Sequence, residues 1–109
     1  MLISTQDNIA NYKVVKTFGL VKGNAVRSRN IVRNLMGNLK TIVGGEVAEW
    51  TKALAETREQ ALDRLINQAK DMGANGIVCL RFVTSEMEPS ASEILAYGTA
   101  VQLELVSTT

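Results

Sequence analysis

The side chains that bind soft metal ions are scarce in this sequence. Among its 109 residues there is no histidine and a single cysteine, Cys79. Zinc and copper(I) sites use several thiolate or imidazole ligands, so we assign no metal ligand to one chain and leave the cofactor open. Cys79 lies inside the apolar run Ile77–Val83, where a free cysteine usually packs as a small hydrophobe. The alternative is that several copies of Cys79 meet on the axis of an assembly.

Carboxylates offer a second metal chemistry, because hard cations prefer oxygen ligands. Three of them, Glu86, Glu88 and Glu93, flank a loop that contains Pro89, the only proline. Their spacing does not match an EF-hand calcium loop. We therefore interpret this segment as a solvated acidic loop, with a metal ion as the alternative.

A small anion is the next candidate ligand. Gly44-Gly45 precedes an expected helix, and the free amides of a helix start attract phosphate. However, Glu46 at the same helix start would repel an anion, and the lysine-hydroxyl pair of a Walker loop is missing. A tight turn between two helices is the simpler interpretation.

One basic cluster follows the first strand. No aromatic residues alternate with it, as single-stranded nucleic acid would require, and the net charge of the chain is only +1. We expect a solvated helix start, or salt bridges to a neighbouring subunit, and no nucleic-acid partner. The residues of the cluster are Lys22, Arg27, Arg29, Arg33 and Lys40.

No catalytic constellation is present in the sequence. The serines lack a histidine that would act as base, so we assign no catalytic residue. The enzyme alternative is a site between subunits around Glu46, Trp50 and Tyr97. For Tyr97, a packed aromatic ring with its hydroxyl on a partner is the simpler interpretation.

The elements that would position these residues follow from periodicity and turn signals. Residues 12–21 predict a strand that ends near Lys22-Gly23-Asn24, and residues 2–5 a short edge strand. A helix is expected from Ser28, as N-cap, to the stop at Gly44-Gly45. Its apolar stripe is Ile31, Leu35, Leu39 and Ile42.

A second, longer helix is predicted from Glu46 to Met72, with Gly73 as its left-handed C-terminal cap. Thr57-Arg58-Glu59-Gln60 resembles a capping box, but the apolar stripe keeps its phase there, so we predict one helix. Strands Ile77–Val83 and Ile94–Leu105 complete a β-α-α-β-β chain. The predicted fold is α+β, with an antiparallel sheet packed on two helices.

The last two strands predict an assembly. In Ile94–Leu105 the odd positions are bulky, whereas the even positions up to Ala100 are small and apolar. Two helices cover only one face of a sheet, and an apolar second face usually marks an interaction surface. Gly98 in mid-strand indicates a bulge or a close backbone approach. We therefore expect a homo-oligomer; the alternative is that the N-terminal strand wraps the sheet within one chain.

Length and composition predict a single domain, residues 1–109. No segment is long and apolar enough to span a membrane, and the N-terminus lacks the pattern of a signal peptide. A single cysteine forms no internal disulfide. The expected location is the cytoplasm.

A set of motifs, most of them centred on glycine, runs through the chain: Gly19–Gly23, Ile42–Glu46, Arg58 with Ala61, Ala69–Val78 and Tyr97–Val101. In this order and spacing they resemble the YbjQ-like family, labelled "putative heavy-metal-binding" and of uncharacterised function. The resemblance covers nearly the whole chain and implies an α+β protomer, a ring-shaped homopentamer and no established reaction. Trp50, Gly76 and Cys79 depart conservatively from the family pattern. From the two-faced apolar strands and this resemblance we expect an oligomeric binding or scaffolding module, with a metal ion or small anion as possible ligand. The alternatives are a protein that binds an anion or nucleotide between subunits and, last, an enzyme with a site between subunits.

Overall fold

The protein is described by a computed structural model that covers residues 1–28, 45–87 and 91–106. Its elements follow the order β1 (Leu2–Ile3), β2 (Tyr12–Ser28), α2 (Gly45–Asp71), β3 (Gly76–Met87) and β4 (Ala91–Leu105). The side chains of residues 45–47 are also outside the description. The helix expected from Ser28 to residue 42 lies outside the described residues, and Ser28 itself ends strand β2.

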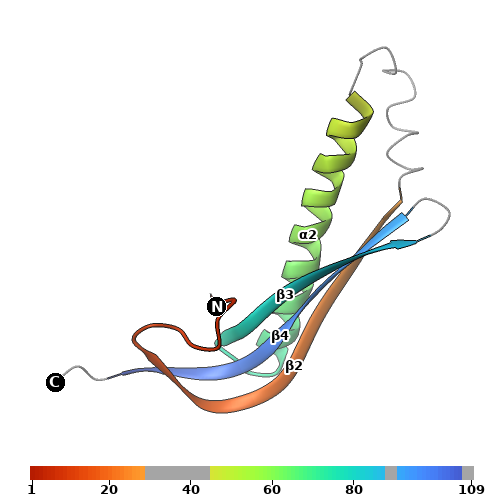
Figure 1. Ribbon diagram of the computed structural model, residues 1–109. Coiled ribbons are helices and arrows are strands. Elements are labelled where there is room, and N and C mark those ends of the chain that lie inside the picture. The colour runs from red at the N-terminus through yellow and green to blue at the C-terminus, as the bar shows by residue number, and fades with distance from the viewer. Residues whose placement is uncertain (29–44, 88–90, 107–109) are drawn as a thin grey trace.

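The four strands form one curved sheet in the order β1-β3-β4-β2, and α2 lies across one of its faces (Figure 1). Strand β4 pairs antiparallel with both neighbours, whereas β1 pairs parallel with β3. The α+β class is therefore confirmed, but the prediction of a purely antiparallel sheet is wrong. Two residues of β1 suffice to make the sheet mixed, because the N-terminus enters alongside β3 in the same direction.

Strand β2 is longer than predicted. It continues through Lys22-Gly23-Asn24 to Ser28, and it stays in register with β4 to the end. Gly23 is needed there for space and not for a turn. A Cβ atom at this position would lie 2.3 Å from the Ala61 carbonyl oxygen and 2.4 Å from the Leu65 nitrogen. The backbone of α2 therefore rests directly on the backbone of β2.

Polar side chains of α2 complete this contact. The backbone N–H of Lys22 donates to Gln68 Oε1 over 2.7 Å, and Arg64 Nη1 donates to the carbonyl oxygen of Asn24. Both backbone groups point away from β4, at the outer edge of the sheet. Since an uncovered edge strand is a template for unwanted pairing, α2 both packs on the sheet and covers the middle of this edge.

The single long helix is confirmed, including its passage through Thr57. The stripe that faces the sheet is made mainly of small residues and packs on the small, even-numbered positions of β4. Gly73, with φ of +89°, forms the left-handed cap after the helix. Its N–H donates to the carbonyl oxygen of Lys70, and the N–H of Ala74 donates to the carbonyl oxygen of Ala69. The core on this face is Val21, Ala25, Ala61, Leu65, Ala69, Ala74, Ile77, Leu80, Ile94, Ala96 and Ala100.

Candidate interaction surface

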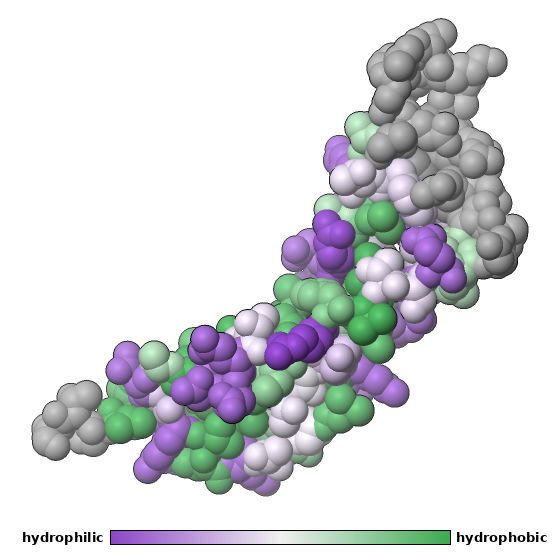
Figure 2. All heavy atoms as spheres, in the orientation of Figure 1, coloured by the Kyte–Doolittle hydropathy of each residue, from purple (hydrophilic) through white to green (hydrophobic). Residues whose placement is uncertain are grey.

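We call the side of the sheet that α2 covers the helix face, and the opposite side the open face. Register and alternation place Leu20, Lys22, Asn24 and Val26 of β2 on the open face, together with the odd positions of β4. Leu20 is 66% exposed and Val26 is 52% exposed. Apolar side chains also reach the surface over the curved part of the molecule, interspersed with polar ones (Figure 2). With these exposed apolar side chains, the open face is the candidate surface for contact with a partner.

One end of the open face is covered by the chain itself. There, Val101 and Leu103 of β4 are buried together with Val78 of β3, and Ile9 and Tyr12 pack against them. The N-terminal segment thus wraps part of the second face, as the intramolecular alternative expected. It does not reach Leu20 and Val26, which remain exposed.

The open face also carries a polar row. Tyr97 lies between Lys22 of β2 and Arg81 of β3 in the strand register. Beyond Tyr97 on the same face, Asn24 Nδ2 donates to Glu93 Oε2 over 3.2 Å. Arg81 Nη1 is held by the carbonyl oxygens of Thr5 and Leu80, at 2.6 and 2.8 Å. This mixture of half-exposed aromatic, amide and charged groups suits a protein or small-molecule contact more than a chelated metal.

The basic cluster expected from the sequence is not formed by its described members. Arg27 lies in strand β2 on the helix face, opposite buried Ser92, whereas Lys22 lies on the open face. Arg29, Arg33 and Lys40 lie outside the described residues, as does Gly44. Alternation along a strand separates two cations that sequence proximity had grouped.

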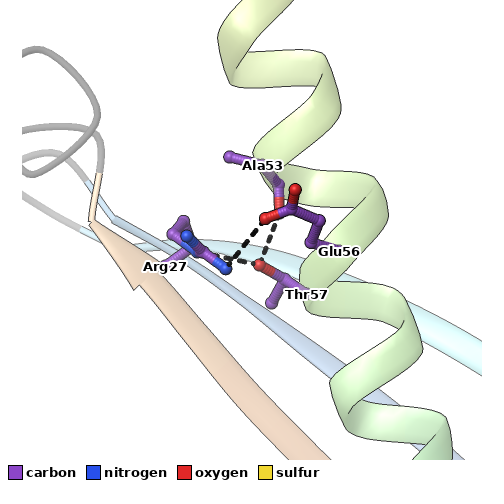
Figure 3. A network of polar contacts seen from close by, with 4 residues as sticks. All are labelled: Arg27, Ala53, Glu56 and Thr57. Atoms are coloured by element: carbon purple, nitrogen blue, oxygen red, sulfur yellow. Dashed lines mark hydrogen bonds and ion pairs between the residues drawn. The ribbon is translucent and has the colours of Figure 1, made fainter. Parts of the chain in front are cut away.

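Arg27 instead joins β2 to α2 (Figure 3). Its Nε donates to Thr57 Oγ1 over 3.2 Å, and its guanidinium lies 3.8 Å from Glu56 Oε2. The Thr57 hydroxyl, which is completely buried, donates to the carbonyl oxygen of Ala53 over 2.7 Å. Arg27 thus has a hydrogen-bond acceptor and an ion-pair partner within the chain, and the neighbouring carboxylate of Glu56 disfavours an anion at this position.

Cys79 lies in a bulge of β3. Its φ is +58°, rare for a residue with a side chain, and its N–H donates to the carbonyl oxygen of Gln6. The side chain is half-buried against the cluster of Val78, Val101 and Leu103. This environment is apolar, and within residues 1–28, 45–87 and 91–106 no group of three or more His, Cys, Asp or Glu could hold a metal ion.

The acidic residues near the β3–β4 turn do not converge. Glu86 lies opposite Ser92 on the helix face and accepts a hydrogen bond of 3.0 Å from its hydroxyl. Glu93, one position along β4, lies on the open face with Asn24. Glu88 lies outside the described residues. The sheet therefore separates two of the three carboxylates that a shared cation would need.

The residues of the enzyme alternative are also apart within one chain. Trp50 packs with Ala53 and Leu54 on α2, and Tyr97 lies on the open face on the other side of the sheet. The side chain of Glu46 is outside the description. The described chain does not form a cleft from Trp50 and Tyr97.

Asn75 has a structural role that the sequence did not indicate. Its Nδ2 donates to the carbonyl oxygen of Leu103 over 3.0 Å, and its Oδ1 accepts from the Leu103 N–H over 2.7 Å. The side-chain amide thus continues the β3 ladder along β4. This role depends on pairing with Leu103, which lies 28 residues away in the chain.

These features define a class: a small α+β protomer with a long helix on one face of a mixed four-stranded sheet, an uncovered second face and no assembled catalytic centre within the described chain. The profile of the YbjQ family, described as "putative heavy-metal-binding", matches residues 1–104. The chain therefore belongs to the YbjQ family, as its motifs indicated.

Curated relatives agree with this assignment, and a solved structure shares the fold. A UPF0145 protein of Dehalococcoides mccartyi is 46% identical over 104 residues, which are 95% of this chain and 100% of that protein. A UPF0145 protein of Methanococcus vannielii is 48% identical, over 95% of this chain and 99% of its own length. The fold is similar to the crystal structure of a Pediococcus pentosaceus protein of unknown function from the DUF74 family. The TM-score is 0.66, the identity 18%, and the coverage 95% of this chain and 98% of that one.

No helix in the described part of the chain is long and apolar enough to cross a membrane.

Proposed function

We propose that this protein is the subunit of a homo-oligomeric ring, pentameric by family resemblance, that acts as a binding or scaffolding module. The shape of the protomer is the observation that carries the proposal. Its radius of gyration is 18.0 Å, whereas a compact domain of this length has about 13 Å. A chain so extended buries too little of its own surface to be self-contained, and a second copy is the simplest cover.

The surface area supports the same proposal. The chain exposes 7171 Å², whereas a compact monomer of 11.9 kDa exposes about 5,900 Å². The excess, about 1,300 Å², is larger than the roughly 800 Å² that one partner contributes to a standard interface. Leu20 and Val26 are part of this surface, and burying each side chain would contribute about 1.5–3 kcal/mol.

Native mass spectrometry tests the assembly directly. We expect a five-subunit mass at micromolar protein concentration. Leu20→Glu introduces a charge in the centre of the open face and should shift the distribution toward smaller species. The matched control is Thr51→Glu on the exposed side of α2, which should leave the mass unchanged. A monomeric wild-type mass would refute the proposal.

Metal binding is the second candidate function, favoured by the description of the family. Because one described chain does not assemble three metal-binding side chains, such a site would combine residues of several copies, with Cys79 as the only thiol. Substoichiometric metal, lost in Cys79→Ala, would support a thiolate site on the ring axis. Metal that persists in Cys79→Ala and after removal of the acidic loop at Glu86–Glu93 would refute both proposed sites.

A further inference from the structure

Asn75 and Gly76 form the only Asn-Gly pair in the sequence. In such a pair the main-chain nitrogen of the glycine can attack the side-chain amide carbon of the asparagine, because glycine has no Cβ to hinder the approach. The new N–Cγ bond closes a succinimide ring, and the side-chain NH2 leaves with the proton of the attacking nitrogen as ammonia. Water then opens the ring at either carbonyl carbon, so that residue 75 becomes an aspartate or an isoaspartate.

The folded chain holds the side-chain amide of Asn75 away from this reaction. Nδ2 donates to the carbonyl oxygen of Leu103 over 3.0 Å, and Oδ1 accepts from the Leu103 N–H over 2.7 Å. Both hydrogen bonds have to break before Cγ can turn toward the nitrogen of Gly76. Asn75 itself lies at the surface, so water reaches the amide once they have broken.

The nitrogen of Gly76 is held as well. Gly76 pairs with Val101 of β4. The carbonyl oxygen of the next residue, Ile77, accepts from the N–H of Ser4 on the side of β1. Since successive residues of a strand direct their N–H and C=O groups to opposite edges, the Gly76 N–H points toward β4. The attacking atom is therefore part of the β3–β4 ladder.

We propose that Asn75-Gly76 is a site of spontaneous deamidation, and that opening of the β3–β4 ladder at Leu103 sets its rate. Asn75 directly precedes the first residue of β3, and the ends of elements open more readily than their centres. The reaction needs only water, and it does not depend on the proposed homo-oligomer.

Deamidation removes contacts of β3 with both of its neighbours. A carboxylate has no N–H, so the Leu103 carbonyl oxygen loses its donor and faces a negative charge. In isoaspartate the main chain runs through the former side chain and becomes longer. The carbonyl group of Asn75, which accepts from the Leu2 N–H over 3.1 Å, then becomes part of a side-chain carboxylate. The start of β3 is therefore held less firmly to β4 and, in isoaspartate, to β1.

The test compares the rate of deamidation at residue 75 in the native protein and in the full chain unfolded in guanidinium chloride, at one mildly alkaline pH and one temperature. Peptide mass spectrometry follows the loss of the amide, and enzymatic methylation detects isoaspartate. We expect the unfolded wild-type chain to react at least tenfold faster than the native protein. A smaller difference would overturn the control of the reaction by the fold.

Gly76→Ala is the matched variant, because its methyl group hinders the attacking nitrogen. The comparison is made between unfolded chains, so it does not depend on how the variant folds. We expect unfolded Gly76→Ala to lose the amide of Asn75 at least tenfold more slowly than unfolded wild type. An unfolded wild-type chain that reacts no faster than this variant would overturn the site itself.

Hydrogen exchange of the Leu103 amide measures the opening independently. Because this N–H donates to Asn75 Oδ1, it exchanges only when the contact is open. The ratio of native to unfolded deamidation rates should agree within tenfold with the open fraction that exchange gives, and a larger disagreement would overturn the proposed opening. In isolated deamidated protein the Leu103 amide should exchange at least tenfold faster. The Lys22 amide, which donates to Gln68, should change less than twofold; unchanged exchange at Leu103 would overturn the expected loss of contact.

Discussion

Gly23→Ala tests how closely α2 rests on the sheet. The added Cβ would lie 2.3 Å from the Ala61 carbonyl oxygen and 2.4 Å from the Leu65 nitrogen. Both are backbone atoms in the middle of a helix, so no side-chain rotation relieves the clash. An ordinary contact is about 3.5 Å, so the helix has to move outward by roughly 1 Å. The packing of Leu65, which is completely buried, would loosen with it.

In Gly23→Ala, two effects lower the free energy of unfolding and one smaller effect raises it. Overpacking of a core contact costs about 1–3 kcal/mol. The hydrogen bonds from α2 to Lys22 and Asn24 contribute about 0.5–1.5 kcal/mol each and would lengthen. Against this, alanine reduces the entropy of the unfolded chain by about 0.4–1 kcal/mol. We expect Gly23→Ala to lower the free energy of unfolding by about 2–4 kcal/mol.

Urea unfolding, followed by far-UV circular dichroism and by the fluorescence of Trp50, the only tryptophan, measures this change. The midpoint should fall by roughly 1 M or more. Lys22→Ala, one residue away on the open face, is the control and should change stability by less than about 0.5 kcal/mol. All samples are compared at one protein concentration, because assembly contributes to apparent stability. If both variants unfold at the same midpoint, α2 does not rest on the backbone of β2.

Two further substitutions test polar contacts. Thr57→Val keeps the shape of the side chain but removes the acceptor of Arg27, so we expect a loss of about 1–2 kcal/mol in thermal unfolding. Glu56→Gln, at a half-exposed ion pair, should cost less than about 0.5 kcal/mol. If Glu56→Gln lowered stability as much as Thr57→Val, Thr57 would not be the more important partner of Arg27. Asn75→Ala leaves both backbone groups of Leu103 without their partner, and a loss of about 1–3 kcal/mol in urea unfolding is expected; an unchanged midpoint would show that water replaces the amide.

The long helix was predictable because its signals are local. An apolar stripe that keeps its phase through Thr57 and a glycine at position 73 define one helix from sequence alone, and both appear in the structure. The small apolar positions of β4 were also recognised as one face. These features depend on the period of a single element, so they need no knowledge of what packs against it.

The length of β2 was not predictable in this way. Lys22-Gly23-Asn24 has the composition of a turn, but Gly23 is small because a helix forty residues later in the chain needs its space. The separation of Arg27 from Lys22 has the same origin, since only a continuous strand places them on opposite faces. Glu86 and Glu93 are likewise close in the sequence but lie on opposite faces of the sheet.

The two faces of the sheet are built for different neighbours. On the helix face, Gly23, Ala25, Ala96 and Ala100 are small, and this allows the backbone of α2 to approach closely. Side chains of this size on the open face would make little contact with a partner, but that face carries Leu20, Val26 and the bulky odd positions of β4. Large side chains bury the most apolar area per residue when a second surface meets them. The division of small and large residues shows that the helix closes one face within the chain, and it supports our proposal that a second copy closes the other face.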